Sequence, residues 1–309
     1  MKPIKVIIDC DPGHDDAIAL LMAHKLPEIE LVAVTTVCGN APLERTTINA
    51  RRIMELLEAT DVPIAAGCST PLARQLVLGT ADGPSGLDGS PYLPEPKTEL
   101  VPMHGVDFLA QTLREADEPI VLVPTGPLTN IGMLVLKHPE VLPKIAKVVL
   151  MGGAFYRRSE IITPTEFNIF CDPEAAEIVL ASGLDITMVG LDVTMHVLVE
   201  EEEFAAIEKI DTPLSRVVFD WLKFYEKLHR GQMGIGGALH DPLALAVGID
   251  PDLIETREAH VSIDRTGTHT FGATVADYWK LNGEEPNVKV ASRVDSAKFF
   301  EMLYRSLKL

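Results

Sequence analysis

The feature that most limits the fold is an alternation, repeated from the first residues, between short β-branched apolar runs and longer amphipathic stretches. Apolar runs of roughly four to eight residues are typical of buried strands, and apolar residues spaced three and four apart are typical of helices. The expected strands are residues 4–8, 30–36, 63–66, 119–123, 147–151 and 185–189. The expected helices between them are residues 15–26, 43–59, 106–115, 129–137 and 173–181.

This alternation predicts an α/β fold with an open, mostly parallel (mixed) sheet, Rossmann-like, flanked by helices on both faces. We further expect a C-terminal helical and hairpin portion, with helices over residues 213–230 and 295–309 and a β-hairpin over 257–275. No linker or repeat divides the sequence, so one domain over residues 1–309 is expected. Ligand sites in such sheets lie beyond the carboxyl ends of the strands. The Gly- and Pro-rich stretch 76–98 is expected to be a binding loop or lid.

Charge and composition exclude several classes of protein. The chain has 27 Lys and Arg against 45 Asp and Glu, a net charge of −18, whereas binding to nucleic acid needs clustered positive charge. No apolar run is long enough for a membrane span. The cysteines lack the C-x-x-C spacing of zinc or redox sites, which favours a reducing, cytoplasmic location. Neither a nucleic-acid nor a membrane partner is therefore expected.

The strongest chemical signal is a group of four carboxylates within eight residues, directly after the first expected strand. They are Asp9, Asp11, Asp15 and Asp16. A helix cap with acids in the first turn accounts for one or two of them, but four at one strand end repel one another unless a cation neutralises them. Oxygen ligands alone point to a hard ion, Ca²⁺ or Mg²⁺.

Two other strand-to-helix junctions offer further candidates. Asp241 follows a Gly-rich stretch and opens a helix, and its neighbour His240 is a candidate acid or base because histidine titrates near neutral pH. Residues 124–130 form a turn whose backbone carbonyls could complete an oxygen shell.

A fourth segment carries candidate sugar ligands. Glu166 and Asn168 stand two residues apart, so in an extended segment both side chains face the same way and suit sugar hydroxyls. Asp172, followed by Pro173, is expected to be a plain helix N-cap.

Six segments in chain order resemble a known family. They are residues 9–16 (DCDPGHDD), 35–40 (TTVCGN), 125–130 (TGPLTN), 151–153 (MGG), 166–168 (EFN) and 240–241 (HD). These motifs are similar to those of the nucleoside hydrolases, the inosine/uridine-preferring family of nucleoside N-ribohydrolases. The resemblance spans nearly the whole chain.

The resemblance implies one Ca²⁺ that binds the attacking water and the ribose 2′- and 3′-hydroxyls. The matching metal ligands are Asp11, Asp16, Asp241 and the backbone carbonyl of Thr125. The implied reaction is hydrolysis of the N-glycosidic bond of a ribonucleoside through an oxocarbenium-like ribose, giving ribose and a free base for nucleoside salvage. A homodimer or homotetramer is also implied.

The resemblance further assigns roles to individual side chains. Asp11 is implied to be the general base as well as a ligand, and His240 the acid that protonates the leaving base. The residues implied to hold the ribose are Asp15, Asn40, Met151, Glu166 and Asn168.

The helix expected over residues 213–230 offers candidates for the base side of the substrate. Tyr225 and His229 are four residues apart, share one face of that helix, and are candidates to close over the base. His14, inside the first motif, is expected to have a structural role.

Two departures from the family pattern leave details open. Many members have an Asn before Glu-Phe-Asn on the ribose 5′ side, and here Glu160 or Thr163 is the candidate replacement. Many also carry a histidine in the loop after the third strand, where this chain has Ala81 and Asp82, so the preferred base stays open.

Two alternatives remain at this stage. Asp9 and Asp11 after a strand could belong to a haloacid-dehalogenase-like phosphohydrolase, although that family usually has Thr or Val at the position held here by Gly13. A non-catalytic, calcium-dependent nucleoside binder is the other, although a binder needs neither Asp11 as base nor His240 as acid.

Overall fold

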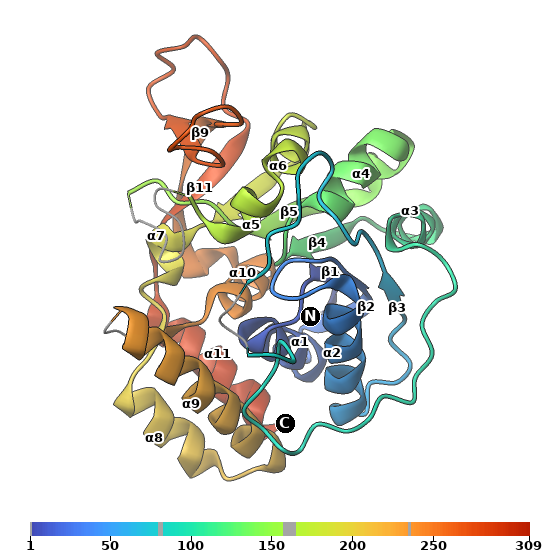
Figure 1. Cartoon of the computed structure of the whole chain (residues 1–309), viewed down its shortest axis with the longest axis vertical. Coiled ribbons are helices and arrows are strands. Elements are labelled where there is room, and N and C mark those ends of the chain that lie inside the picture. The colour runs from blue at the N-terminus through green and yellow to red at the C-terminus, as the bar shows by residue number, and fades with distance from the viewer. Residues whose placement is uncertain (1, 80–82, 157–164, 234–235) are drawn as a thin grey trace.

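A computed structural model describes residues 2–79, 83–156, 165–233 and 236–309, and only the backbone of residues 228, 229, 232 and 233. Its centre is a sheet of nine strands in the order β10-β9-β11-β6-β5-β4-β1-β2-β3 (Figure 1). The strands are β1 (Ile4–Cys10), β2 (Ile29–Thr36), β3 (Ile64–Ala66), β4 (Ile120–Pro124), β5 (Ile145–Met151), β6 (Ile186–Val189), β9 (Ile254–Ile263), β10 (Thr274–Asp277) and β11 (Val288–Val294). The pairs from β3 to β11 are parallel, and β9 pairs antiparallel with β11 and β10.

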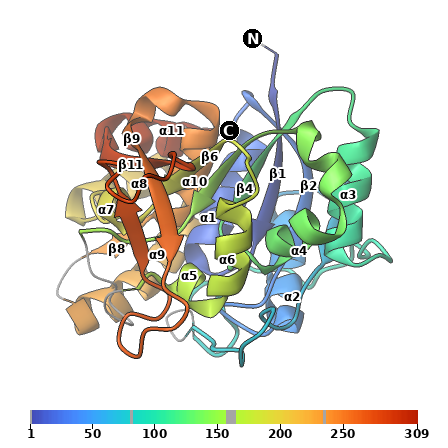
Figure 2. The ribbon, with the colours of Figure 1, turned by 90° about the horizontal axis from the view of Figure 1, so that it is seen from above.

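Helices cover both faces of this sheet (Figure 2). One face packs against α3 (Gly105–Glu115), α4 (Thr129–Lys137) and α6 (Pro173–Leu180). The other face packs against the layer formed by α1 (His14–Lys25), α2 (Leu43–Leu56), α8 (Glu201–Ile210), α9 (Pro213–Met233), α10 (His240–Ile249) and α11 (Ser296–Lys308). The shorter elements are η1 (Pro139–Lys144), α5 (Phe167–Cys171), α7 (Leu191–Thr194), β7 (Leu198–Val199), β8 (Gly237–Ala238) and η2 (Pro251–Leu253).

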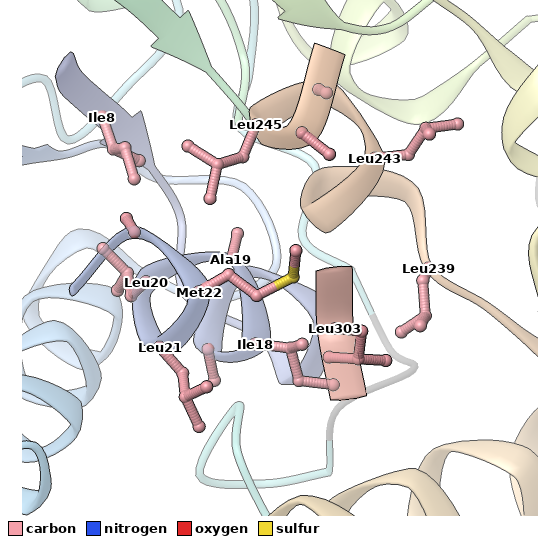
Figure 3. Close-up of a cluster of buried hydrophobic side chains, with 14 of the residues drawn as sticks. Ile8, Ile18, Ala19, Leu20, Leu21, Met22, Leu239, Leu243, Leu245 and Leu303 are labelled. Atoms are coloured by element: carbon pink, nitrogen blue, oxygen red, sulfur yellow. The ribbon is translucent and has the colours of Figure 1, made fainter. Parts of the chain in front are cut away.

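The centre of the second layer is α1, which packs against α10 and α11. Its residues from His14 to Ala23 are all buried, because a helix that is apolar nearly all round has no face for solvent. Figure 3 shows part of this buried cluster, with Ile18 and Met22 of α1, Leu243 and Leu245 of α10 and Leu303 of α11. This packing brings the first turns of α1 and α10, which are more than 220 residues apart in the chain, to the same end of the sheet.

The predicted fold class is confirmed, with two differences. The hairpin expected over residues 257–275 is present as β9 and β10, but it continues the main sheet instead of standing apart. The strand that joins them to the parallel strands, β11, was not expected from the sequence, because Lys289, Ser292 and Arg293 interrupt its apolar residues. β11 pairs antiparallel with β9, and antiparallel strands commonly carry polar residues because one face of the sheet can face solvent.

Among the helices that the structure describes, none is long and apolar enough to cross a membrane.

Candidate active site

The candidate site lies at the carboxyl ends of β1 and β4, where parallel strands lead into helices. After β1 the chain passes through Asp11 and Pro12 to Gly13, the N-cap of α1, so Asp15 and Asp16 lie in the first turn. The N-terminal end of a helix favours negative charge, and Asp16 also accepts a hydrogen bond from the Gly13 N–H (3.1 Å). This local geometry directs the side chains of the first motif into one buried region.

Three of the predicted acidic residues meet there. Asp15, Asp16 and Asp241 each offer a carboxylate oxygen, and these oxygens all lie within 4.8 Å of one another. Burial and the neighbouring carboxylates raise the pKa of Asp241 well above its usual range. A bound divalent cation would remove this repulsion, and a buried set of oxygen ligands fits a hard ion such as Ca²⁺ or Mg²⁺.

Asp11 lies beside this carboxylate cluster in a slot made by two glycines. Its Oδ2 accepts a hydrogen bond from the Asn40 N–H (2.7 Å), and a Cβ placed on Gly39 would overlap that oxygen. A Cβ on Gly126 would come within 2.6 Å of Oδ1. The Asn40 amide also donates to the Asp11 carbonyl (3.2 Å) and to Asp16 Oδ2 (3.4 Å), so it joins the slot to the cluster.

Thr125 connects the loop after β4 to the carboxylates. Its hydroxyl donates to Asp16 Oδ1 (2.7 Å), and its carbonyl, the predicted metal ligand, accepts a hydrogen bond from the Asn168 amide (2.6 Å). The carbonyl therefore lies next to the predicted ligands and is oriented by a predicted ribose-binding residue.

The expected extended segment at Glu166 and Asn168 is wrong. Glu166 is the N-cap of α5, and its carboxylate accepts hydrogen bonds from the backbone N–H groups of Gly153, Asn168 and Ile169. The segment is helical because the Glu166 side chain bonds the free N–H groups at the start of α5, which an extended backbone would not allow. Asn168 lies in the first turn of α5, where its amide also reaches the carbonyl of Met151 (3.3 Å). Asp172 caps α6, as predicted.

The structure places His240 next to Asp241 at the start of α10, partly buried. Its Nδ1 is 2.7 Å from the hydroxyl of Thr194, at the end of α7. Burial lowers the pKa of His240 to about 4, so the resting side chain is neutral at neutral pH. Nothing in the local sequence around Thr194 indicated this partner, because the contact depends on how α7 and α10 pack.

Tyr225, which is predicted to close over the base, is buried in α9 and lies near His14, with 5.7 Å between ring centroids. His14 also stacks on Phe224 (5.3 Å), and its Nε2 is 2.5 Å from the carbonyl of Asp88. His14 therefore contacts both α9 and the loop around Asp88, which fits the structural role expected for it. The side chain of His229 lies outside the described residues.

Several open positions of the predicted site also fall outside the described residues. These are Ala81 and Asp82 of the Gly-rich loop, and Glu160 and Thr163 on the expected ribose 5′ side.

The model of the inosine-uridine preferring nucleoside hydrolase family matches residues 6–301. The chain belongs to this family. The resemblance deduced from the motifs, and with it the expected enzyme class of nucleoside N-ribohydrolase, is confirmed, and the phosphohydrolase alternative is wrong.

Curated relatives of this nucleoside hydrolase match over nearly their whole length. The pyrimidine-specific ribonucleoside hydrolase RihA of Photobacterium profundum is 45% identical over 306 residues, covering 98% of each chain. The protein of the same name from Escherichia coli O1:K1 / APEC is 42% identical over 309 residues, covering 99% of this chain and 98% of that one.

Solved structures agree on the fold. A purine-preferring ribonucleoside hydrolase from Gardnerella vaginalis superposes with a TM-score of 0.91 at 33% identity, covering 98% of both chains. A plant nucleoside hydrolase superposes with a TM-score of 0.92 at 30% identity, covering 99% of both chains.

Proposed function

We propose that this nucleoside hydrolase uses one Ca²⁺ to hydrolyse the N-glycosidic bond of pyrimidine ribonucleosides, releasing ribose and the free base. The observation that carries the proposal is the buried cluster of Asp15, Asp16 and Asp241 at the carboxyl end of the sheet, beside Asp11. The preference for pyrimidines rests on relatives 45% and 42% identical that are named pyrimidine-specific.

The residues that would hold the cation are Asp11, Asp16, Asp241 and the carbonyl of Thr125. When bound, the ion supplies Lewis-acid activation of a water molecule and a positive charge for ribose hydroxyls. Asp11 is suited to accept the proton of that water, because Asn40 and the glycine slot orient its carboxylate. The neighbouring carboxylates also stabilise positive charge that develops on the ribose ring in the transition state.

The ribose would be held by residues around this centre. Asp15 would accept and Asn40 would donate hydrogen bonds at its hydroxyls; in support, Asp15 belongs to the carboxylate cluster and the Asn40 amide donates to Asp16 in it. Glu166, Asn168 and Met151 form the adjoining wall, joined by the hydrogen bonds of the Asn168 amide and backbone. Fixed polar groups of this kind lower the entropic cost of reaching the transition state.

His240 would assist departure of the base. Because its resting form is neutral, it acts in the free enzyme as a hydrogen-bond donor and gains a full proton only if substrate binding raises its pKa. If the Thr194 hydroxyl donates to Nδ1, the ring hydrogen resides on Nε2 and would be available to a carbonyl oxygen of the pyrimidine. Tyr225 and His229 of α9 are proposed to line the base side.

We also propose that residues 1–309 form one nucleoside hydrolase domain, that the chain assembles as a homodimer or homotetramer, and that it serves nucleoside salvage in the cytoplasm.

The test is to incubate the Ca²⁺-loaded protein with uridine, cytidine, inosine and a ribose 5-phosphate ester, and to measure ribose, free base and phosphate. Release of ribose and base, faster from uridine or cytidine than from inosine, is expected. Faster release from inosine would overturn the pyrimidine preference. Nucleoside affinity without turnover would favour a non-catalytic binder.

A further inference from the structure

Directly beneath the site lies a buried polar network to which no step of the proposed reaction assigns a role. It consists of Asp9 at the end of β1, Thr35 at the end of β2, and Asn130 in the first turn of α4, all fully buried. Burying polar groups is costly unless their hydrogen bonds are made, so such networks are either well satisfied or retained for a function.

Asn130 is the centre of this network. Its Nδ2 donates to Asp9 Oδ1 (2.7 Å) and to the carbonyl of Thr36 (3.0 Å), and its Oδ1 accepts from the N–H of Cys68 (2.7 Å). A Cβ on Gly67 would overlap the amide, so the amide fits only because residue 67 is glycine. One side chain thus joins the ends of β1 and β2 and the residue after Gly67 to the start of α4.

Asp9 connects Asn130 to the candidate site. Its Oδ1 also accepts from the Thr35 hydroxyl (2.5 Å), and its backbone carbonyl accepts from the N–H of Thr125 (2.8 Å). Two residues further along the chain is Asp11. Asp9 is therefore tied to both the β1 and the β4 segments that would supply cation ligands.

The second oxygen of Asp9 distinguishes this network from an ordinary structural one. Oδ2 is buried and has no hydrogen-bond partner among the described residues. A buried carboxylate held through one oxygen is a poor way to stabilise a fold, because an apolar pair of the same shape would avoid the desolvation cost.

We propose that Asn130 and Asp9 are positioning residues that set the spacing between the Asp11 loop and the Thr125 loop for cation binding. This inference rests on the proposed function, because it assigns the cation site to the same residues. Side chains behind metal ligands typically change metal affinity by about 10- to 100-fold when they are replaced.

The test measures Ca²⁺ affinity by titration calorimetry, without substrate, together with thermal unfolding in chelator. Asn130→Asp keeps the size of the side chain but removes both donated hydrogen bonds and sets a carboxylate against Asp9. We expect its Ca²⁺ affinity to fall by about 10-fold or more. Thr35→Val is milder, because it removes only one hydrogen bond to Asp9. It is also expected to lower the Ca²⁺ affinity, and it tests the inference if Asn130→Asp does not fold.

Asn287→Asp is the matched control. The Asn287 amide likewise bonds a backbone N–H and carbonyl, both of Val261 (2.8 and 3.1 Å), but it lies between β9 and β11. It is expected to lose stability while binding Ca²⁺ like the wild type. The exchange variant Asp9→Asn/Asn130→Asp restores an amide-carboxylate pair and is expected to regain part of the affinity lost in Asn130→Asp.

Wild-type affinity in both Asn130→Asp and Thr35→Val would overturn the inference, as would equal losses of affinity in Asn130→Asp and Asn287→Asp. A wild type that binds Ca²⁺ but releases no ribose would overturn the proposed function alone. A wild type without Ca²⁺ affinity would overturn both.

Discussion

The hydroxyl of Thr125 donates a 2.7 Å hydrogen bond to Oδ1 of Asp16, joining the loop after β4 to the first turn of α1. Both residues are buried, and they are 109 positions apart in the chain. Hydrogen bonds to a charged group in such surroundings are stronger than those between neutral groups. The contact therefore holds a predicted metal ligand and a predicted carbonyl ligand at a fixed separation.

Replacing this hydroxyl should weaken the site without disturbing the fold. Thr125→Val keeps the shape of the side chain, and loss of a hydrogen bond to a charged group costs about 1.5–3 kcal/mol, or roughly 10- to 100-fold in Ca²⁺ affinity. Calorimetry and steady-state kinetics measure the effect. Thr47→Val is the control. Among the described residues, the side-chain hydroxyl of Thr47 bonds only another hydroxyl, that of Thr36 (2.7 Å). Equal effects of the two variants would contradict the assignment.

The glycine slot around Asp11 makes a steric prediction. In Gly39→Ala the new Cβ would displace Oδ2 of Asp11, so we expect kcat to fall by about 100-fold or more, as when a reacting group moves by about 1 Å. Gly231→Ala, where no atom of the described residues lies within 4 Å of a new Cβ, should retain wild-type activity. An active Gly39→Ala protein would show that the position of Asp11 does not limit the reaction.

Replacing one ionisable carboxyl group of the cluster by an amide should stabilise the metal-free protein. The raised pKa of Asp241 means that the folded state holds its proton more tightly than the unfolded state. The stability contributed by this group is therefore present at low pH and is lost as pH rises above about 4. In chelator, Asp241→Asn should be more stable than the wild type, on the order of 1 kcal/mol, by an amount that grows with pH.

Excess Ca²⁺ should reverse this difference, because it stabilises only the wild type. Thermal unfolding in chelator between pH 5 and 8, and again in Ca²⁺, gives both readings. Asp107→Asn is the contrasting variant: hydrogen bonds from Lys137 and His138 lower the pKa of Asp107, so its replacement should slightly destabilise the protein in either condition. A metal-free Asp241→Asn protein less stable than the wild type would argue against repulsion in the cluster.

Replacing His240 should lower kcat mainly for substrates whose leaving group must be protonated. Its replacement by alanine is expected to lower kcat for uridine by about 100-fold or more, the usual range for a positioned acid, and to change the rate for p-nitrophenyl riboside much less. Because burial lowers the pKa of His240 to about 4, no inflection of kcat/KM from this residue is expected between pH 6 and 8. Equal losses on both substrates would refute its role toward the base.

Local apolar patterns in the sequence predict most of the helices and strands. Apart from η1 and α5, the strands and helices up to α6 are predicted within a few residues, because each shows a continuous apolar run or a helical apolar period. The sequence does not predict β11, because Lys289, Ser292 and Arg293 interrupt its apolar residues, and it predicts an extended segment at Glu166 because α5 has only five residues. β11 therefore lacks a continuous apolar run, and α5 is too short to show a helical period.

For the site, the sequence by itself determined the family, the α/β alternation and the acidic first motif, since these depend on residues that are neighbours in the chain. Only the tertiary structure decided that Asp241 meets Asp15 and Asp16, that Asp11 lies beside this cluster, and that Thr194 contacts His240. These contacts depend on the order of strands in the sheet and on the packing of α1 against α10. Local propensity sets where an element begins and ends, whereas burial of apolar faces sets which distant elements meet.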